Sequence, residues 1–264
     1  MRVGLGWRRE LGVSILAHLD EIDVVEVLAE EYFEATAAEK RALRFLAAHV
    51  DVVVHGTTLG LASTDGVERP RLDALARLLE WLEPRAWSEH LAFVRAGGIE
   101  IGHLAAPPRN DETLAALARN VAEARRVTGS APLLENVASL VEPPCCTYSE
   151  AEWLDVVPRA AGAELLLDLH NLYANATNFG FDAAPPREHV KMIHLAGGRV
   201  IGGDRILDDH LHAVPDVLYA MLAEIASEEM TVIIERDGNY PPFEELLAEV
   251  RRARVTCPAT CNTF

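Results

Sequence analysis

The stretch ELLLDLHN at residues 164–171 joins an apolar run to a carboxylate, an imidazole and an amide. Short, almost unbroken apolar runs are typical of parallel strands that are covered on both faces. Two other segments also consist of an apolar run followed by polar residues, at 190–197 (VKMIHLAG) and 231–237 (TVIIERD). The same pattern predicts five further strands, at 2–7, 24–29, 52–56, 87–93 and 132–137. The chain therefore carries eight predicted strands.

Segments with helical periodicity separate these strands. Thr36 opens one of them with Glu39 three residues later, which is a capping-box pattern, and another ends before Gly129, a residue type suited to that position. Alternating strands and helices over 264 residues predict the α/β class and a (β/α)8 barrel. We expect a single domain over 1–264, with a short tail from about 255 to 264. The predicted helices span 36–50, 70–83, 111–128, 149–162, 215–228 and 243–254.

Composition argues against several classes of function. The formal net charge is −17 and the basic residues form no stripe, so we expect no nucleic-acid partner. No apolar run reaches the roughly 18 residues of a membrane span, and no secretory signal is evident, so we expect no membrane association and a cytoplasmic location. Glycine motifs for dinucleotides or a P-loop are missing. The cysteines show no C-x-x-C spacing; they are Cys145, Cys146, Cys257 and Cys261.

Ionisable side chains stand at the ends of six successive predicted strands. In a barrel, the carboxyl ends of the strands surround one face, where the active site is built. One such residue is explained by structural hydrogen bonding, but six strands in succession are not, because buried charges are costly without a partner. Imidazole and carboxylate without thiolate suit iron, manganese or zinc. The set comprises His55, His90, Glu135, Asp168, His170, Asn171, His194, Glu235 and Asp237.

A second polar patch, Asp208-Asp209-His210-Leu211-His212, follows the seventh predicted strand. On an extended loop, Asp208 and His210 point to the same side because they are two residues apart. They would then complete a metal site near His194. The alternative is a solvated loop without ligands, since a lone D-x-H pattern has little specificity.

Eight short motifs follow one another along nearly the whole chain. They are LAEEYF (28–33), VHGTTLG (54–60), SEHLAF (88–93), PLLENVASL (132–140), LLLDLHNLYANATNFG (165–180), IHLAGG (193–198), LDDHLHAV (207–214) and IIERDGNYPP (233–242). In this order they resemble the multinuclear non-haem iron-dependent oxidative enzymes, the family that includes the methanobactin-maturing oxidase. The resemblance implies a TIM-type barrel of the xylose-isomerase-like kind.

The same resemblance implies two or three iron ions, with dioxygen as co-substrate. It also implies a ribosomally made precursor peptide as substrate, usually modified at cysteine, and a peptide-recognition partner protein that delivers it. Glu135 lies between the ligands of neighbouring strands and is expected to bridge two irons. His170 and Asp237 are expected to be catalytic groups. Carried over by motif, the metal ligands are His55, His90, Glu135, Asp168, Asn171, His194, Asp208, His210 and Glu235.

Four positions depart from the family pattern. His170 stands in the D-x-N-N element, and strand alternation from Asp168 predicts that it points inward, as a ligand or an acid–base group; the alternative is an outward side chain without a role. Phe179 replaces the His of N-H-G, Gly198 replaces the last His of H-L-A-G-H, and Arg236 stands where Trp is commoner. Placed around the mouth, these changes predict an altered peptide substrate or lost activity.

Two other functions stay open at this point. One is a divalent-metal (zinc or manganese) hydrolase or sugar isomerase on a related barrel of the xylose-isomerase or endonuclease IV kind. The other is a degenerate barrel that only binds, which intact Glu135 and Asp168 argue against. The tail adds one more question, because Cys257 and Cys261 either imitate a substrate peptide or are two spare thiols.

Overall fold

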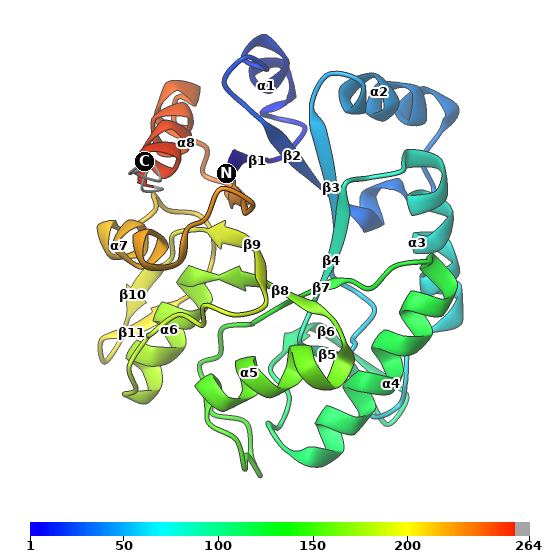
Figure 1. Ribbon diagram of the computed structural model, residues 1–264, viewed down its shortest axis with the longest axis vertical. Coiled ribbons are helices and arrows are strands. Elements are labelled where there is room, and N and C mark those ends of the chain that lie inside the picture. The colour runs from blue at the N-terminus through cyan, green and yellow to red at the C-terminus, as the bar shows by residue number, and fades with distance from the viewer. Residues whose placement is uncertain (257–264) are drawn as a thin grey trace, which may run out of the picture.

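The structure is a computed structural model and describes residues 1–256. Eight of its strands form a closed parallel barrel in the order β1-β12-β9-β8-β7-β4-β3-β2 (Figure 1). The predicted (β/α)8 barrel is therefore confirmed. The barrel strands are β1 (Arg2–Gly6), β2 (Val24–Leu28), β3 (Asp51–Gly56), β4 (Ala86–His90), β7 (Leu133–Glu135), β8 (Glu164–Asp168), β9 (Val190–Leu195) and β12 (Thr231–Ile234).

Helices surround the barrel on its outer side (Figure 1). All six predicted helices are present, and the capping box at Thr36 and Glu39 and the left-handed Gly129 are formed as expected. The short α1 and η1 and the longer α6 were not predicted. The helices are α1 (Gly12–Ala17), η1 (Ala29–Tyr32), α2 (Ala37–Ala47), α3 (Arg69–Leu82), α4 (Asp111–Thr128), α5 (Glu150–Ala161), α6 (Leu169–Phe179), α7 (Asp216–Ile225) and α8 (Phe243–Thr256).

Two apolar layers explain the unbroken apolar runs of the strands. In β8, Leu165 and Leu167 pack into the large core between the barrel and the helices, whereas Leu166 joins a small cluster inside the barrel. Each strand is thus apolar on both faces, as parallel strands under helices must be. The inner cluster fills the barrel interior on the N-terminal side of the polar strand ends. It consists of Val24, Val53, Leu166, Met192 and Ile233.

Three strands end three residues earlier than the sequence predicted. β8 stops at Asp168, because its side chain accepts a hydrogen bond from the backbone N–H of Asn171 at 2.7 Å and begins α6. His170 and Asn171 therefore lie in the first turn of a helix, and the prediction that placed them on a strand is wrong. β4 likewise stops at His90, and β12 at Ile234.

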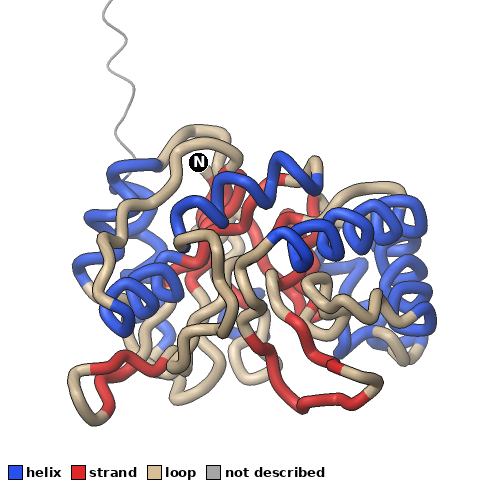
Figure 2. Tube along the Cα trace, turned by 90° about the horizontal axis from the view of Figure 1, so that it is seen from below, coloured by secondary structure: helices blue, strands red, loops and turns tan. Residues whose placement is uncertain are grey.

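Two hairpins extend the loops after β4 and β9. They are β5 (Phe93–Ala96) with β6 (Ile99–Ala105), and β10 (Arg199–Ile201) with β11 (Arg205–Leu207). Both project from the same side of the barrel (Figure 2). Neither was predicted from the sequence. Because they follow barrel strands directly, they stand at the face where the strands end.

The last helix, α8, continues through Thr256, and the rest of the tail expected from about 255 to 264 lies outside the described residues. The question about Cys257 and Cys261 falls outside the described residues. Within residues 1–256, no helix has both the length and the apolar character needed to cross a bilayer.

Candidate metal centre

The polar strand-end residues form a layer directly above the apolar cluster inside the barrel. Because side chains alternate along a strand, a residue two positions after an inward apolar one also points inward. Five residues follow this rule: Glu26 after Val24, His55 after Val53, Asp168 after Leu166, His194 after Met192 and Glu235 after Ile233. His90 pairs in register with Glu135, and Asp168 with His194, so neighbouring strands bring them side by side.

A cavity of about 660 Å³ opens above this layer. Its walls carry part of the layer's side chains, strand β11 with Ile206, and the loops that follow β7 and β12 with Leu140 and Tyr240. Seven predicted site residues line it: His55, His90, Asn171, Asp208, His210, Glu235 and Asp237. The structure thus brings together residues that are far apart in the sequence, such as His55 and Asp237, which are separated by 182 positions.

His55 and His90 approach the same oxygen of Glu135. The Nε2 atoms of His55 and His90 lie 3.3 and 3.4 Å from Glu135 Oε2. Their Nδ1 atoms are engaged elsewhere, with Ser88 Oγ at 2.8 Å and with the Gly56 carbonyl at 3.2 Å. Both rings therefore turn Nε2 toward the carboxylate. Burial acts to lower the pKa of His90, but the carboxylates of Glu135 and Glu89 outweigh it and raise that pKa to about 9.

His194 is the centre of a second group. Its Nδ1 lies 3.2 Å from Glu135 Oε1 and 3.0 Å from Glu235 Oε2. Its Nε2 lies 2.9 Å from Glu26 Oε2, a fully buried carboxylate. Burial opposes protonation of this ring, yet Glu26, Glu135 and Glu235 together raise the pKa of His194 well above its usual value. Glu26 thus anchors the ring from the side opposite the other two acids.

His210 brings the loop after β11 into the site. Its Nε2 lies 2.8 Å from Asp208 Oδ1 and 3.7 Å from Asp168 Oδ2, while its Nδ1 lies 3.2 Å from Glu235 Oε2. His210 adopts a left-handed backbone with φ of 53°, so the predicted extended loop is wrong at this residue. Asp208 and His210 nevertheless face each other, because the turn brings the two side chains together.

These groups share members and form one connected centre. Glu135 belongs to the group with His55 and His90 and also to the group with Asp168, His194 and Glu235. Glu235 in turn joins His210 and Asp237. A carboxylate that offers one oxygen to each of two neighbouring groups has the form of a bridging ligand. The expectation that Glu135 bridges two irons stays a prediction.

Three buried oxygen atoms of the predicted ligands make no hydrogen bond. They are Glu135 Oε2, Asp168 Oδ2 and Asn171 Oδ1. Buried polar atoms in proteins are nearly always bonded, and unbonded ones call for an ion or a water. All three belong to predicted ligands and lie among imidazoles, a donor set that suits iron, manganese or zinc. The residues present therefore fit several bound cations.

The two predicted catalytic groups lie in different settings. Asp237 is half-exposed on the cavity wall, contacts Arg8, and has Oδ2 3.4 Å from His210 Nδ1. His170 is buried at 1% exposure and does not line the cavity, although its Nδ1 lies 2.6 Å from Asp208 Oδ1. The catalytic role expected for His170 stays a prediction, and any such role would have to act through Asp208, which lines the cavity where His170 does not.

The remaining departures also lie away from the cavity wall. Arg236 is buried and points to Glu249 of α8, with Nη2 3.7 Å from Oε2. Phe179 and Gly198 are likewise not among the residues that line the cavity. The altered substrate expected from these positions stays a prediction, because none of them lines the cavity directly.

Sequence reasoning missed several residues that support the centre. Glu26 and Glu89 are fully buried, and Arg8 is 8% exposed with its guanidinium at Glu235 and Asp237. Ser88, which is fully buried, bonds His55 as described above. Glu26 was visible as a lone acid inside the apolar strand VVEVLA (24–29). Its two-residue spacing from Val24 is the signal that would have found it.

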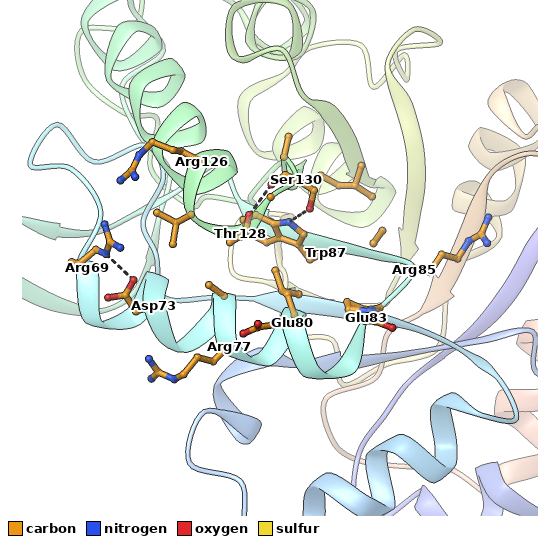
Figure 3. A pocket seen from close by; sticks show the side chains of 18 residues that line it. Arg69, Asp73, Arg77, Glu80, Glu83, Arg85, Trp87, Arg126, Thr128 and Ser130 are labelled. Atoms are coloured by element: carbon orange, nitrogen blue, oxygen red, sulfur yellow. Dashed lines mark hydrogen bonds and ion pairs between the residues drawn. The ribbon is translucent and has the colours of Figure 1, made fainter.

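A second, wider groove of about 960 Å³ runs along α3 from Arg69 to Glu83, beside the C-terminal end of α4 and the starts of β4 and β7 (Figure 3). Its charges are paired on the surface, as between Arg69 and Asp73 at 2.7 Å. Trp87 in its floor donates to Ser130 Oγ at 3.1 Å. No group of metal-binding side chains among residues 1–256 lies in this groove. The chemistry is therefore at the opposite end of the barrel.

Comparison with known proteins identifies the family of the chain. The model of the RiPP precursor modification enzymes MbnB/TglH/ChrH matches residues 2–257. The chain belongs to this family. Enzymes of the MbnB/TglH/ChrH family modify the precursors of ribosomally synthesised and post-translationally modified peptides. The family predicted from the motifs is thereby confirmed.

Relatives and solved structures extend the comparison. A UPF0276 protein of Streptomyces avermitilis is 36% identical over 96% of this chain, which spans about half (54%) of that relative's length. A UPF0276 protein of Rhizorhabdus wittichii is 33% identical, over 88% of this chain and 86% of the relative. A solved D-tagatose 3-epimerase-like protein has a TM-score of 0.65 at 16% identity, over 97% of this chain and 98% of that one. The last likeness concerns the fold alone, and it agrees with the predicted xylose-isomerase-like barrel.

Proposed function

We propose that this member of the MbnB/TglH/ChrH family holds two or three iron ions in the barrel mouth and uses dioxygen to oxidise a precursor peptide at cysteine. One observation carries the proposal: Glu135 presents Oε2 to His55 and His90 and Oε1 to His194. A single carboxylate placed between two sets of imidazoles supports a centre with more than one metal. The family's work on RiPP precursors supports a peptide substrate.

The proposed ligands divide among neighbouring ions. His55, His90 and Glu135 would hold one ion, and Glu135 would also reach a second with His194 and Glu235. Asp208 and His210, with Asp168 and Asn171, would hold the remaining ion. When bound, iron supplies the redox chemistry that the use of dioxygen requires. Carboxylates in this number would offset the charge of several cations in a buried site.

The protein's part is to fix the imidazoles before any ion binds. Ser88 and the Gly56 carbonyl hold the Nδ1 atoms of His55 and His90, so that both Nε2 atoms face Glu135. Glu26 holds Nε2 of His194, so that Nδ1 faces Glu135 and Glu235. Partners of this kind orient metal-binding histidines and make them better ligands.

Asp237 is our proposed catalytic group on the substrate side. Its carboxylate is half-exposed on the cavity wall, beside His210 and next to the guanidinium of Arg8. A carboxylate so placed can accept a proton from the peptide and pass it toward His210. Arg8 keeps that carboxylate oriented, because it also contacts Glu235 of the centre.

We propose that the peptide enters between the two hairpins and that a separate peptide-recognition protein delivers it. A cavity of about 660 Å³ has room for a cysteine side chain and its flanking residues, not for a long peptide. The β10–β11 hairpin supplies Ile206 and Leu207 to its wall, and β6 supplies Leu104. The rest of the peptide would therefore bind to surfaces outside the cavity, including those of the peptide-recognition protein.

The decisive experiment is purification without air, followed by metal analysis and Mössbauer spectroscopy. A cysteine-bearing precursor peptide is then incubated with the iron-loaded protein, with and without dioxygen, and its mass is measured. We expect two or three irons per chain and a mass change only with iron and dioxygen together. Zinc alone in the protein, without iron-dependent turnover, would refute the proposal. Turnover with zinc or manganese in the absence of dioxygen would favour the hydrolase or isomerase alternative, which the same donor set also suits.

A further inference from the structure

His170 has both ring nitrogens engaged by the protein. Its Nδ1 lies 2.6 Å from Asp208 Oδ1. The backbone N–H of Gly198 donates to its Nε2 at 2.9 Å. The ring itself is buried at 1% exposure in the first turn of α6. His170 thus links α6 to the loops that follow β9 and β11.

These two contacts fix the proton on the ring. Nε2 accepts from Gly198, so it carries no hydrogen, and the single proton of a neutral ring lies on Nδ1. That proton points at the carboxylate of Asp208, which can only accept. A metal ion at Nδ1 would force the proton onto Nε2, where it would face the N–H of Gly198. The distances among His170, Asp208 and His210 suit a shared ion, but the hydrogen bonds of His170 leave no lone pair for it.

Gly198 is shaped to receive this ring. A Cβ atom at position 198 would lie 2.5 Å from Cε1 and 2.9 Å from Nε2 of His170. It would also lie 2.2 Å from the carbonyl oxygen of Leu207. Any side chain at 198 therefore displaces either the ring or the β11 backbone. His170 and Gly198, two of the four departures from the family pattern, form one matched pair.

We infer that His170 is a positioning residue that holds Asp208 toward the metal centre, and that it does not bind metal itself. The inference rests on the proposed metal site and deepens it. Asp208 Oδ1 also lies 2.8 Å from Nε2 of His210, but this contact lacks hydrogen-bond geometry, so the hydrogen bond from His170 is what orients the Asp208 carboxylate. Its second oxygen is then presented in one orientation. Without His170, the carboxylate would keep only its contact with His210.

The direct test is ¹⁵N NMR of the histidine rings in the wild-type protein, first without metal and then with zinc, a diamagnetic probe. We expect His170 to be protonated on Nδ1 in both states, with little change on zinc addition. The rings of His55, His90 and His194 should shift to zinc-bound positions. A His170 nitrogen that shifts like theirs, or a proton found on Nε2, overturns the inference. If none of the rings shifts, the metal site itself is wrong, so the two failures are distinguishable.

Two variants with a matched control extend the test. His170→Asn keeps an N–H donor near the Nδ1 position, whereas His170→Ala removes it. We expect His170→Ala to weaken retention of one iron by roughly 10- to 100-fold, as loss of a ligand's hydrogen-bond partner does. His170→Asn should recover most of that loss. His103→Asn, an exposed histidine bonded only to a local carbonyl, should behave as wild type. Equal retention in His170→Ala and wild type, or no recovery in His170→Asn, contradicts the positioning role.

Discussion

Replacing Asp168 with asparagine should stabilise the metal-free protein while weakening its metal centre. Burial raises the pKa of Asp168 from 3.8 to about 7, and the neighbouring Asp208 and Glu135 add to the rise although His210 and His194 oppose it. The asparagine of Asp168→Asn preserves the shape and can still cap α6 through its side-chain oxygen, which the carboxylate now does for the N–H of Asn171. The variant therefore removes a buried negative charge and little else.

The size of the effect follows from the pKa shift. Each pKa unit corresponds to about 1.4 kcal/mol, so a rise of about three units costs the folded protein up to ~4 kcal/mol above pH 7. The unfolded chain ionises this group from about pH 4, and the folded protein only near pH 7. The penalty on wild-type Asp168 therefore grows as the pH rises from 4 to 7 and is constant above that. Below pH 4 the variant should have no such advantage.

Urea unfolding of protein treated with a chelator measures this difference. At pH 8 we expect metal-free Asp168→Asn to unfold at a higher urea concentration than wild type, with the slope unchanged. With iron added, the order should reverse, because a ligand that binds the folded state stabilises it in proportion to its affinity. Asp182→Asn, an exposed substitution, is the control and should change stability by less than about 0.5 kcal/mol. A metal-free Asp168→Asn protein that is less stable than wild type at pH 8 would refute the idea of excess negative charge.

Three further substitutions test the parts of the fold that support the site. Glu26→Gln should leave the fold intact but weaken iron retention by roughly 10- to 100-fold, because His194 loses a charged partner. Metal analysis after gel filtration measures this retention, and full retention would show that Glu26 does not support the centre. Ser149→Ala breaks the capping box of α5 with Glu152 and should cost about 1 kcal/mol in urea unfolding with no change in bound iron. Leu166→Ala opens a hole under the centre and should cost roughly 2–5 kcal/mol; a loss below about 1 kcal/mol would mean that the inner cluster is loosely packed.

The barrel was predictable because its strands carry strong local signals. Runs such as ELLLD are apolar on both faces, and caps such as Thr36 mark where helices begin. The ends of the strands were less predictable. Asp168 continues the alternation of β8 and also caps α6, and nothing in the letters D-L-H-N says that the second role ends the strand. The hairpins after β4 and β9 were missed because β5, β10 and β11 have only three or four residues each, too few for a clear apolar pattern.

Most of the candidate centre was also predictable, since every predicted ligand lies in or beside it. What could not be derived is which atom of each ring faces the ions. That choice depends on Ser88, the Gly56 carbonyl and Glu26, which come from other strands. Glu26 escaped notice because a single acid in an apolar strand is equally typical of a structural ion pair. Only the closed barrel places it beside His194.

The positions that differ from the family pattern lead to a different view of substrate choice. His170 and Gly198 contact each other behind Asp208, and Arg236 turns outward to Glu249. None of these three residues lines the cavity, so they offer no direct contact to a substrate held there. We expect selectivity to come from segments that do line the cavity, such as residues 137–140 after β7 and residues 206–209 in and after β11. The contact between His170 and Gly198 sets the position of Asp208 and its loop. Through Asp208, which lines the cavity, the two residues influence the shape of the cavity wall indirectly.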